Sequence, residues 1–441
     1  MTRVGRALVR EGTRREMSGR TGHARPRSWP LTAAALALMA ATSLGAQHPG
    51  STPAPTSDEL FDSGRGLARI DLRLHSQDWQ KLKQHFQENT YYPADVVFNG
   101  HTVRNVGIRS RGNGSRRESK PGLRVDFDRY VTAQRFLGLK SIVLDNLAQD
   151  PSGVRDATAA RLYARLGVPV SRERHARLYV NNEYAGLYAI VESIDKAFLA
   201  RVFGTRDGNV QNDGYLFEYK WLGPWHLGYL GADFGPYQER FSPRTHEDAS
   251  AVEKFAPIEQ LVRLANELPP ERLVAELHPH LDLGALVRLV AAQAFVADTD
   301  GFTGIYGVNN FYLYRLEGSA RHVLIAWDND HAFSAPDRPI DEGLDENVLM
   351  RRAMQVPALR ALYFDVLEEA AAIAEEGRLS AEDPGWLEHQ VRQQLEMIYT
   401  AMAEDAHRPY ALDAHHRAYD ELIGFARERP HHVREQIAQY R

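Results

Sequence analysis

The stretch DTDGFTGIYGVNNFYLYRLEGSARHVLIAWDNDHAF, residues 298–333, decides how the rest of the chain is interpreted. It contains two runs rich in β-branched and aromatic residues, FYLY at 311–314 and VLIAW at 323–327. Gly318 and Ser319 lie between these runs and supply a turn. The pattern therefore predicts a β-hairpin.

Polar residues stand at both open ends of this expected hairpin. Asn310 precedes the first strand, and Asp300 lies on the loop that leads into it. Asp328 and Asp330 follow the second strand. Because a hairpin brings its ends together, one amide and up to three carboxylates are expected to converge. Such an oxygen-rich set suits Mg²⁺, which usually takes one or two carboxylates plus substrate phosphates.

The same order of residues matches that of phosphoryl-transfer sites. There an aspartate orients or deprotonates the acceptor, an asparagine binds one metal ion, and an aspartate after a hairpin binds the other. The alternative is a surface hairpin with ordinary polar ends. Trp327 is apolar, and Asp328 and Asp330 are closely spaced. These two features make a metal site about as well supported as an ordinary surface hairpin.

Composition excludes several classes of partner and site. The chain has 441 residues, of which 43% are hydrophobic, and its formal net charge is −5. This balance predicts no nucleic acid partner and no attraction to an anionic membrane surface. The absence of cysteine excludes disulfides, thiolate zinc sites and cysteine nucleophiles.

Residues 1–46 are predicted to be a signal peptide. Arginines recur through residues 1–30, an apolar run follows at 31–41, and small residues come after it. The run is too short and too rich in alanine for a membrane span. We therefore expect an exported protein that is periplasmic, on the cell surface or extracellular, with no stable membrane span after processing.

The remaining chain divides by pattern into a linker and two lobes. Residues 47–66 are rich in Pro, Ser, Thr and Gly and are expected to be a linker. Residues 67–248 contain several alternating strands and predict a sheet-rich N-terminal lobe. Residues 249–441 are mostly helical and predict a C-terminal lobe, with the hairpin of residues 298–333 inserted. The expected class is α+β.

Short motifs in a fixed order run through most of this mature chain. They are Val106–Ser115, Lys120–Phe127, Leu144–Asn146, Asp150–Ser152, Arg155–Asp156, Leu166–Pro169, Tyr179–Asn182, Tyr184–Tyr188, Val191–Lys196, Asp300–Gly301, Asn310–Tyr314 and Trp327–Phe333. The ordered set resembles the CotH family, the spore-coat-protein-H-like atypical protein kinases. This resemblance implies an atypical protein-kinase-like, two-lobed fold.

The resemblance also implies roles for single residues. Asp300 corresponds to the catalytic aspartate and Asn310 to the metal-binding asparagine, with Asp298 as a substitute for Asp300. The Mg²⁺-binding aspartate corresponds to Asp328, with Asp330 as the alternative. Nine residues separate Asp300 from Asn310, whereas four is usual in kinases. An inserted glycine-rich loop at 302–307 accounts for the difference.

A lysine that contacts phosphate and an acid that holds it are further expectations from the resemblance. Glu192 is the expected acid and Lys120 the expected lysine, with Lys220 as the alternative. Without the resemblance, the sequence would indicate a helix-capping acid at Glu192 and an exposed loop lysine at Lys120. Arg109 and Arg111 are candidates on the sequence pattern alone, without the resemblance. They stand two apart beside a glycine-rich segment, and either act together on one anion or remain exposed strand charges.

The sequence therefore predicts an exported, ATP- and Mg²⁺-dependent kinase that phosphorylates protein Ser or Thr. One alternative is another nucleotide-driven protein-modifying transferase, because a fold does not fix its chemistry. Another is a non-catalytic protein that interacts at the cell surface or envelope. A carbohydrate-binding role is the third, and it rests on the aromatic residues of the loop at 221–237.

Overall fold

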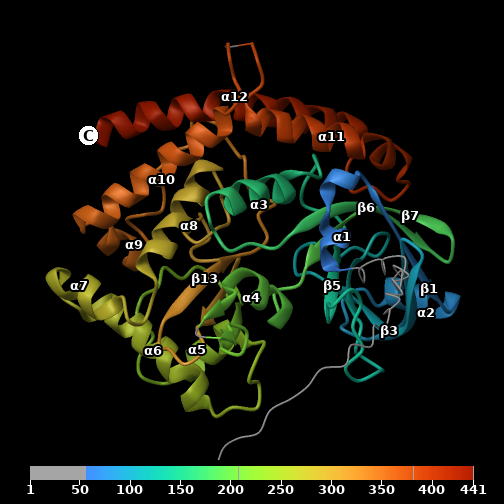
Figure 1. The fold of residues 1–441 in the computed structure, drawn as a ribbon, viewed down its shortest axis with the longest axis horizontal. Helices are drawn as coiled ribbons and strands as arrows, with labels where there is room; N and C mark the ends of the chain where they lie inside the picture. Colours follow the sequence, from blue (N-terminus) through green and yellow to red (C-terminus); the bar gives the residue numbers. More distant parts are fainter. Residues whose placement is uncertain (1–55, 207, 381, 441) are drawn as a thin grey trace, which may run out of the picture. The chain divides into compact units, whose positions relative to one another are not determined.

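A computed structural model describes residues 56–206, 208–380 and 382–440 (Figure 1). The signal peptide expected at residues 1–46 and residues 47–55 of the expected linker lie outside the described residues. The rest of that linker differs from the expectation, because Ser57–Phe61 forms helix α1 and Ser63–Arg65 forms a 3₁₀ helix, η1. Leu60 and Phe61 are buried, so this segment belongs to the folded unit.

Seven strands form a closed barrel. They are β1 (Ala68–Leu74), β2 (Tyr92–Phe98), β3 (His101–Arg111), β4 (Gly122–Asp126), β5 (Ser141–Asp145), β6 (Glu173–Val180) and β7 (Glu183–Glu192). Their order around the barrel is β1-β2-β3-β4-β5-β7-β6, and the parallel pair β1–β6 completes it. Asn99 and Gly100 have φ angles of 49° and 80°. These left-handed angles are what the tight Asn-Gly turn between β2 and β3 requires.

The apolar faces of the barrel strands form a core of their own. Ile70, Leu72, Val96 and Ile108 are fully buried in it. Helix α2 (Ser76–Gln84) packs against β2 and β3. Helix α3 (Arg155–Arg165) packs with the helical part of the molecule.

A second sheet has the order β11-β10-β12-β13. Its strands are β10 (Tyr215–Tyr219), β11 (Phe241–Pro243), β12 (Phe311–Arg315) and β13 (His322–Ala326). Helix α4 (Lys196–Phe203), the short ribbon of β8 (Thr205–Arg206) and β9 (Asn209–Val210), and helix α5 (Gly235–Arg240) lie nearby in the chain. Strand β10, which the sequence places in the N-terminal lobe, hydrogen-bonds with β12. The division into two lobes at residue 248 thus stays a prediction.

From residue 249 onwards the remaining regular elements are helices, apart from the hairpin of β12 and β13. The helices are α6 (Ala251–Glu267), α7 (Pro270–Leu277), α8 (Leu283–Phe295), α9 (Val348–Ala353), α10 (Pro357–Glu375), α11 (Trp386–Glu404) and α12 (Leu412–Tyr440). Helix α10 packs against α8 and α12 (Figure 1). Helix α12 continues through the buried Pro430. Helix α6 begins at a capping box formed by Ser250 and Glu253.

This combination of a barrel, a small antiparallel sheet and packed helices confirms the α+β class. Among the described residues we find no helix that combines the length and the apolar character of a membrane span.

Candidate active site

The predicted hairpin is confirmed, and its polar ends meet. Strands β12 and β13 pair with Phe311 opposite Ala326. The backbone N–H of Trp327 donates to the carbonyl oxygen of Asn310 at 3.2 Å. Asn310, before the first strand, and Asp328, after the second, therefore lie at the same end of the hairpin.

Asp300 is tied to that end by two hydrogen bonds. The side-chain amide of Asn309 donates to Asp300 Oδ1 at 2.9 Å, and that of Asn310 donates to Oδ2 at 3.0 Å. Both oxygens of the carboxylate are thus oriented by neighbouring amides. Because Asn310 uses its nitrogen in this contact, its Oδ1 is the atom available to a cation. The inserted loop does not separate Asp300 from Asn310.

Two site residues adopt a backbone conformation that most side chains avoid. Asn310 has a φ of 53° and Asp328 a φ of 58°. Asn and Asp tolerate the left-handed region better than other non-glycine residues. Unfavourable backbone angles of this kind gather at functional sites, where the surrounding structure imposes them.

These side chains face a cleft of about 1460 Å³. Asp300, Asn310, Asp328 and Asp330 all line it, which brings the predicted catalytic and metal-binding residues together. Asp298, the substitute for Asp300, does not. Asp298 lines a smaller cavity, where its Oδ1 accepts the backbone N–H of Asp300 at 3.0 Å. The structure therefore places Asp300, and not Asp298, at the cleft.

Two carboxylates in the cleft, those of Asp328 and Asp330, have raised pKa values. Asp328 is accessible from the cleft, but its carboxylate is surrounded by protein atoms. This desolvation, followed by the charges of Asp156 and Asp145, raises the pKa of Asp328 to about 7. The charge of Arg111 acts in the opposite direction. Burial and the charge of Asp328 raise the pKa of Asp330 well above its usual range. Crowded, partly desolvated carboxylates of this kind are stabilised by a cation.

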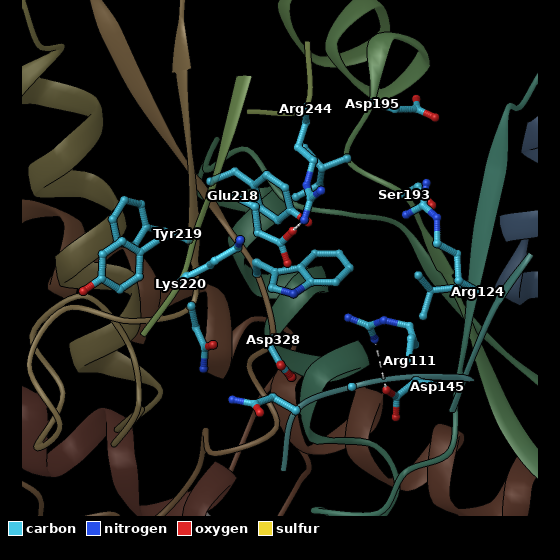
Figure 2. Close-up of a pocket in the computed structure, with 18 of the residues that line it drawn as sticks. Arg111, Arg124, Asp145, Ser193, Asp195, Glu218, Tyr219, Lys220, Arg244 and Asp328 are labelled. Atoms are coloured by element: carbon cyan, nitrogen blue, oxygen red, sulfur yellow. Dashed lines mark hydrogen bonds and ion pairs between the residues drawn. The ribbon is translucent and has the colours of Figure 1, made fainter. Parts of the chain in front are cut away.

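Arg111 is the cationic side chain placed beside these acids. Its guanidinium lies 3.7 Å from Asp145 Oδ2 and 5.5 Å from the centre of the Trp327 ring. Figure 2 shows Arg111 between Asp328 and Asp145, with the ion pair drawn as a dashed line. The arginine is thus held at the edge of the carboxylate cluster and faces the cleft.

Arg109 also lines the cleft, but its donors are engaged with protein groups. It donates to the Tyr91 hydroxyl at 3.1 Å, to Asn89 Oδ1 at 3.0 Å and to the Ser110 carbonyl at 2.9 Å. Arg109 and Arg111 thus face the same cavity with different partners. Of the two, Arg111 has the fewer contacts that an incoming anion would need to replace.

The expected pair of Lys120 and Glu192 is wrong. The ammonium of Lys120 lies 2.8 Å from Asp405 Oδ2, and both side chains are buried. Glu192 instead pairs with Arg172 at 2.9 Å and Arg201 at 2.5 Å. Neither Lys120 nor Glu192 lines the cleft. Each residue sits in a buried ionic contact that fixes the fold, and the partners could not be read from sequence neighbours.

The alternative lysine, Lys220, does line the cleft. It directly follows β10, and its backbone N–H donates to the Arg240 carbonyl at 2.7 Å. Its side chain is exposed, and Figure 2 shows it among the residues that surround the cavity. Of the two lysines that the sequence leaves as alternatives, Lys220 is therefore the one that lines the cleft.

Sequence reasoning assigned no role to Asp145 and Asp156, although both fall in motifs of the resemblance. Asp156, on α3, accepts the backbone N–H of Asn329 at 3.1 Å and its side-chain amide at 2.8 Å. This contact fixes the turn that carries Asp328 and Asp330. Asp145, at the end of β5, holds Arg111. Both are positioning residues.

The donor set fits Mg²⁺ in part. Among the described residues, no group of three or more His, Asp or Glu side chains forms a metal cage. Asn310, Asp328 and Asp330 provide one amide and two carboxylates instead. Mg²⁺ commonly binds through one or two carboxylates and completes its shell with phosphate oxygens and water. The residues present are sufficient for a metal that arrives with a nucleotide.

An aspartate tied to an asparagine, a hairpin, and further aspartates beside an arginine define a kinase-like site. Residues 108–433 match the family described as "CotH kinase protein", and the chain belongs to this family. The resemblance seen in the sequence is thereby confirmed.

The chain is similar to two known proteins. The chain is 24% identical over 265 residues to the inner spore coat protein H of Bacillus subtilis (strain 168), a match that covers 60% of this chain and 68% of the relative. A solved structure, the Helicobacter pylori proinflammatory kinase CtkA, is similar at 9% identity with a TM-score of 0.24. That comparison covers 70% of this chain and 96% of CtkA.

Proposed function

We propose that this chain is an exported kinase that uses ATP and Mg²⁺ to phosphorylate Ser or Thr of a protein acceptor. The observation that carries the proposal is the double hydrogen bond from Asn309 and Asn310 to Asp300, beside Asp328 in one cleft. Export rests on the signal peptide expected from the sequence of residues 1–46.

Several residues of the cleft have a role in this proposal. Asn310 and Asp328, with Asp330 beside them, would hold Mg²⁺, which would neutralise part of the phosphate charge. Arg111 would neutralise a phosphate oxygen while Asp145 holds its guanidinium. An arginine stays charged at any physiological pH and can donate two hydrogen bonds to one phosphate.

Asp300 would act on the acceptor. Its carboxylate accepts the proton of the Ser or Thr hydroxyl as the hydroxyl oxygen bonds to the γ-phosphorus. The bond between that phosphorus and the β–γ bridging oxygen breaks, and ADP leaves with the electron pair. The amides of Asn309 and Asn310 keep Asp300 aimed at the hydroxyl, and such positioning is a large part of catalysis in phosphoryl transfer.

The test compares the thermal stability of the parent with that of an Asp328→Asn variant, each with and without ATP and Mg²⁺. Asparagine tolerates the φ of 58° and keeps the shape, so mainly the charge is lost. A ligand that binds only the folded state stabilises it by about 2.7 kcal/mol at a hundredfold excess over Kd. We expect a rise in melting temperature in the parent and in the exposed control Asp420→Asn, and none in Asp328→Asn.

The type of reaction is then identified by which labelled phosphate of ATP is transferred to the acceptor. Label from the γ-phosphate on a protein acceptor supports kinase activity, whereas label from the α-phosphate indicates adenylylation. A parent that shows no thermal shift at millimolar nucleotide would contradict the proposal and favour a non-catalytic surface protein.

A further inference from the structure

Four large hydrophobic side chains are exposed on two segments that meet beside the cleft. Trp221, Leu222, Ile305 and Tyr306 each keep between 40% and 57% of their surface accessible. Trp221 and Leu222 line the cleft itself. The indole N–H of Trp221 donates to the Tyr306 carbonyl at 3.0 Å, and the two rings meet edge to face at 6.5 Å. We call these four residues the Trp221–Tyr306 patch.

The backbone around Ile305 and Tyr306 is fixed by its hydrogen bonds. The N–H of Ile305 donates to the Thr299 carbonyl at 3.0 Å, and that of Gly307 donates to Gly304 at 3.0 Å. Val308 N–H donates to the Trp225 carbonyl at 2.8 Å. The loop therefore holds its apolar side chains at the surface. Contiguous exposed apolar surface of this kind marks interaction sites.

The patch adjoins the proposed catalytic residue. A Cβ atom added to Gly304 would lie 2.9 Å from the Cα of Asp300, so the loop packs directly on the backbone of that residue. The loop is the same insertion that lengthens the segment between Asp300 and Asn310. A polypeptide that presents a hydroxyl to Asp300 would therefore pass over the patch. An extended chain advances about 3.3 Å per residue, which brings the patch within reach of residues close to that hydroxyl.

We propose that the Trp221–Tyr306 patch binds a large apolar or aromatic side chain of the protein acceptor, about two to four residues from the modified hydroxyl. This inference rests on the proposed function and adds the class of acceptor. The patch continues into the cleft that holds Asp300, which points to the acceptor rather than to an unrelated partner.

The test is a positional peptide library with a fixed Ser or Thr, incubated with labelled ATP and Mg²⁺. The parent is expected to prefer Leu, Phe or Tyr over Ser at one position by about tenfold, the range that one apolar pocket provides. In the double variant Ile305→Ser and Tyr306→Ser, that preference should fall below about twofold. The Tyr306 carbonyl that accepts from Trp221 is retained. The exposed Leu379→Ser is the matched control and should keep the parent's preference.

Nucleotide binding separates the two possible failures. The double variant should keep the thermal shift with ATP and Mg²⁺, because neither substituted residue lines the cleft. A parent that shifts with nucleotide but shows no apolar preference, or labels no peptide, overturns this inference alone. A parent dimer that dissociates in the double variant also overturns it, in favour of self-association. A parent with no nucleotide shift overturns the proposed function and this inference with it.

Discussion

The two lysines that the sequence leaves as alternatives differ in burial. Lys220 is exposed and lines the cleft, whereas Lys120 is buried against Asp405. We predict that Lys220→Met weakens ATP binding about tenfold or more, because a hydrogen bond to a charged group contributes about 1.5 to 3 kcal/mol. The stability of the free protein should not change. Calorimetric titration with ATP and Mg²⁺ measures the affinity.

The exposed Lys81, on α2, provides the control for this substitution. Lys81→Met removes one positive charge from the same molecule away from the cleft, and it should leave the affinity unchanged. Equal affinities for the parent and Lys220→Met would show that Lys220 does not contact the phosphates of ATP.

His175 gives the molecule a pH dependence that is independent of the cleft. It is buried in β6, where a ring nitrogen donates to the Gly153 carbonyl, and burial lowers its pKa to about 4. The unfolded chain binds this proton near pH 6.5, so stability falls as the pH drops from about 6.5 to 4. The loss from this residue is about 3 kcal/mol, since each pKa unit corresponds to about 1.4 kcal/mol. Chemical unfolding across this range measures it.

Replacement of His175 by glutamine isolates this contribution. Glutamine keeps a side-chain N–H donor but does not titrate. The unfolding free energy of His175→Gln should therefore depend less on pH between 6.5 and 4 than that of the parent. Parallel profiles for the two proteins would show that His175 is protonated in the folded state.

At the scale of elements, the loop between Asp300 and Asn310 depends on a close backbone approach at Gly307. Its φ is 79°, and an added Cβ would lie 2.6 Å from the Trp225 carbonyl oxygen. Gly318, in the turn of the hairpin, has a φ of 65° and no atom within 4 Å of an added Cβ. Both alanine variants would lose the conformational freedom of glycine, but only Gly307→Ala adds a clash.

We therefore predict that Gly307→Ala destabilises the protein by about 1 to 3 kcal/mol more than Gly318→Ala, the usual cost of overpacking. Denaturant unfolding measures the difference. Gly307→Ala should also lower the transfer rate, since the loop packs against Asp300. Equal stabilities for the two variants would mean that the loop moves without cost, which would contradict the rigid patch proposed above.

The elements that the sequence predicts best are those whose partners are local. The β12–β13 hairpin follows from two apolar runs and one turn, and with it the meeting of Asn310 and Asp328. Closure of the barrel does not follow, because β1 pairs with β6, which lies far along the chain. Helix α12 continues through Pro430, since the packing of the helix outweighs the cost of a proline within it.

The ionic partners were the least predictable feature of the site. The pairing of Lys120 with Glu192 rested on the resemblance alone. In the structure, Lys120 forms an ion pair with Asp405, and Glu192 forms ion pairs with two arginines. A charged side chain pairs with whichever opposite charge the fold brings close to it. The local sequence pattern contains no information about partners that are distant in the sequence. Asp145 and Asp156 were missed for the same reason.

At the scale of the whole molecule, Lys120 and Asp405 connect the barrel to the helices. Lys120 precedes β4, and Asp405 ends α11. Asp405 also accepts the backbone N–H groups of Leu187, on β7, at 3.0 Å and of His407 at 2.8 Å. Gly186 allows this approach, because an added Cβ would lie 2.5 Å from Asp405 Oδ2. Burial lowers the pKa of Lys120, whereas Asp405 raises it, so the charge of the lysine depends on this partner.

We predict that Lys120→Met destabilises the protein by about 3 to 5 kcal/mol, the usual cost of leaving one charge of a buried pair without its partner. The double variant Lys120→Met and Asp405→Asn should recover much of that loss, because asparagine is neutral and its side-chain oxygen still accepts from Leu187. Denaturant unfolding gives the free energies for this double-mutant cycle. A double variant no more stable than Lys120→Met would locate the loss in packing rather than in charge. Folded Lys120→Met should bind ATP and Mg²⁺ with the parent's affinity, because the lysine connects the barrel to the helices and does not reach the cleft.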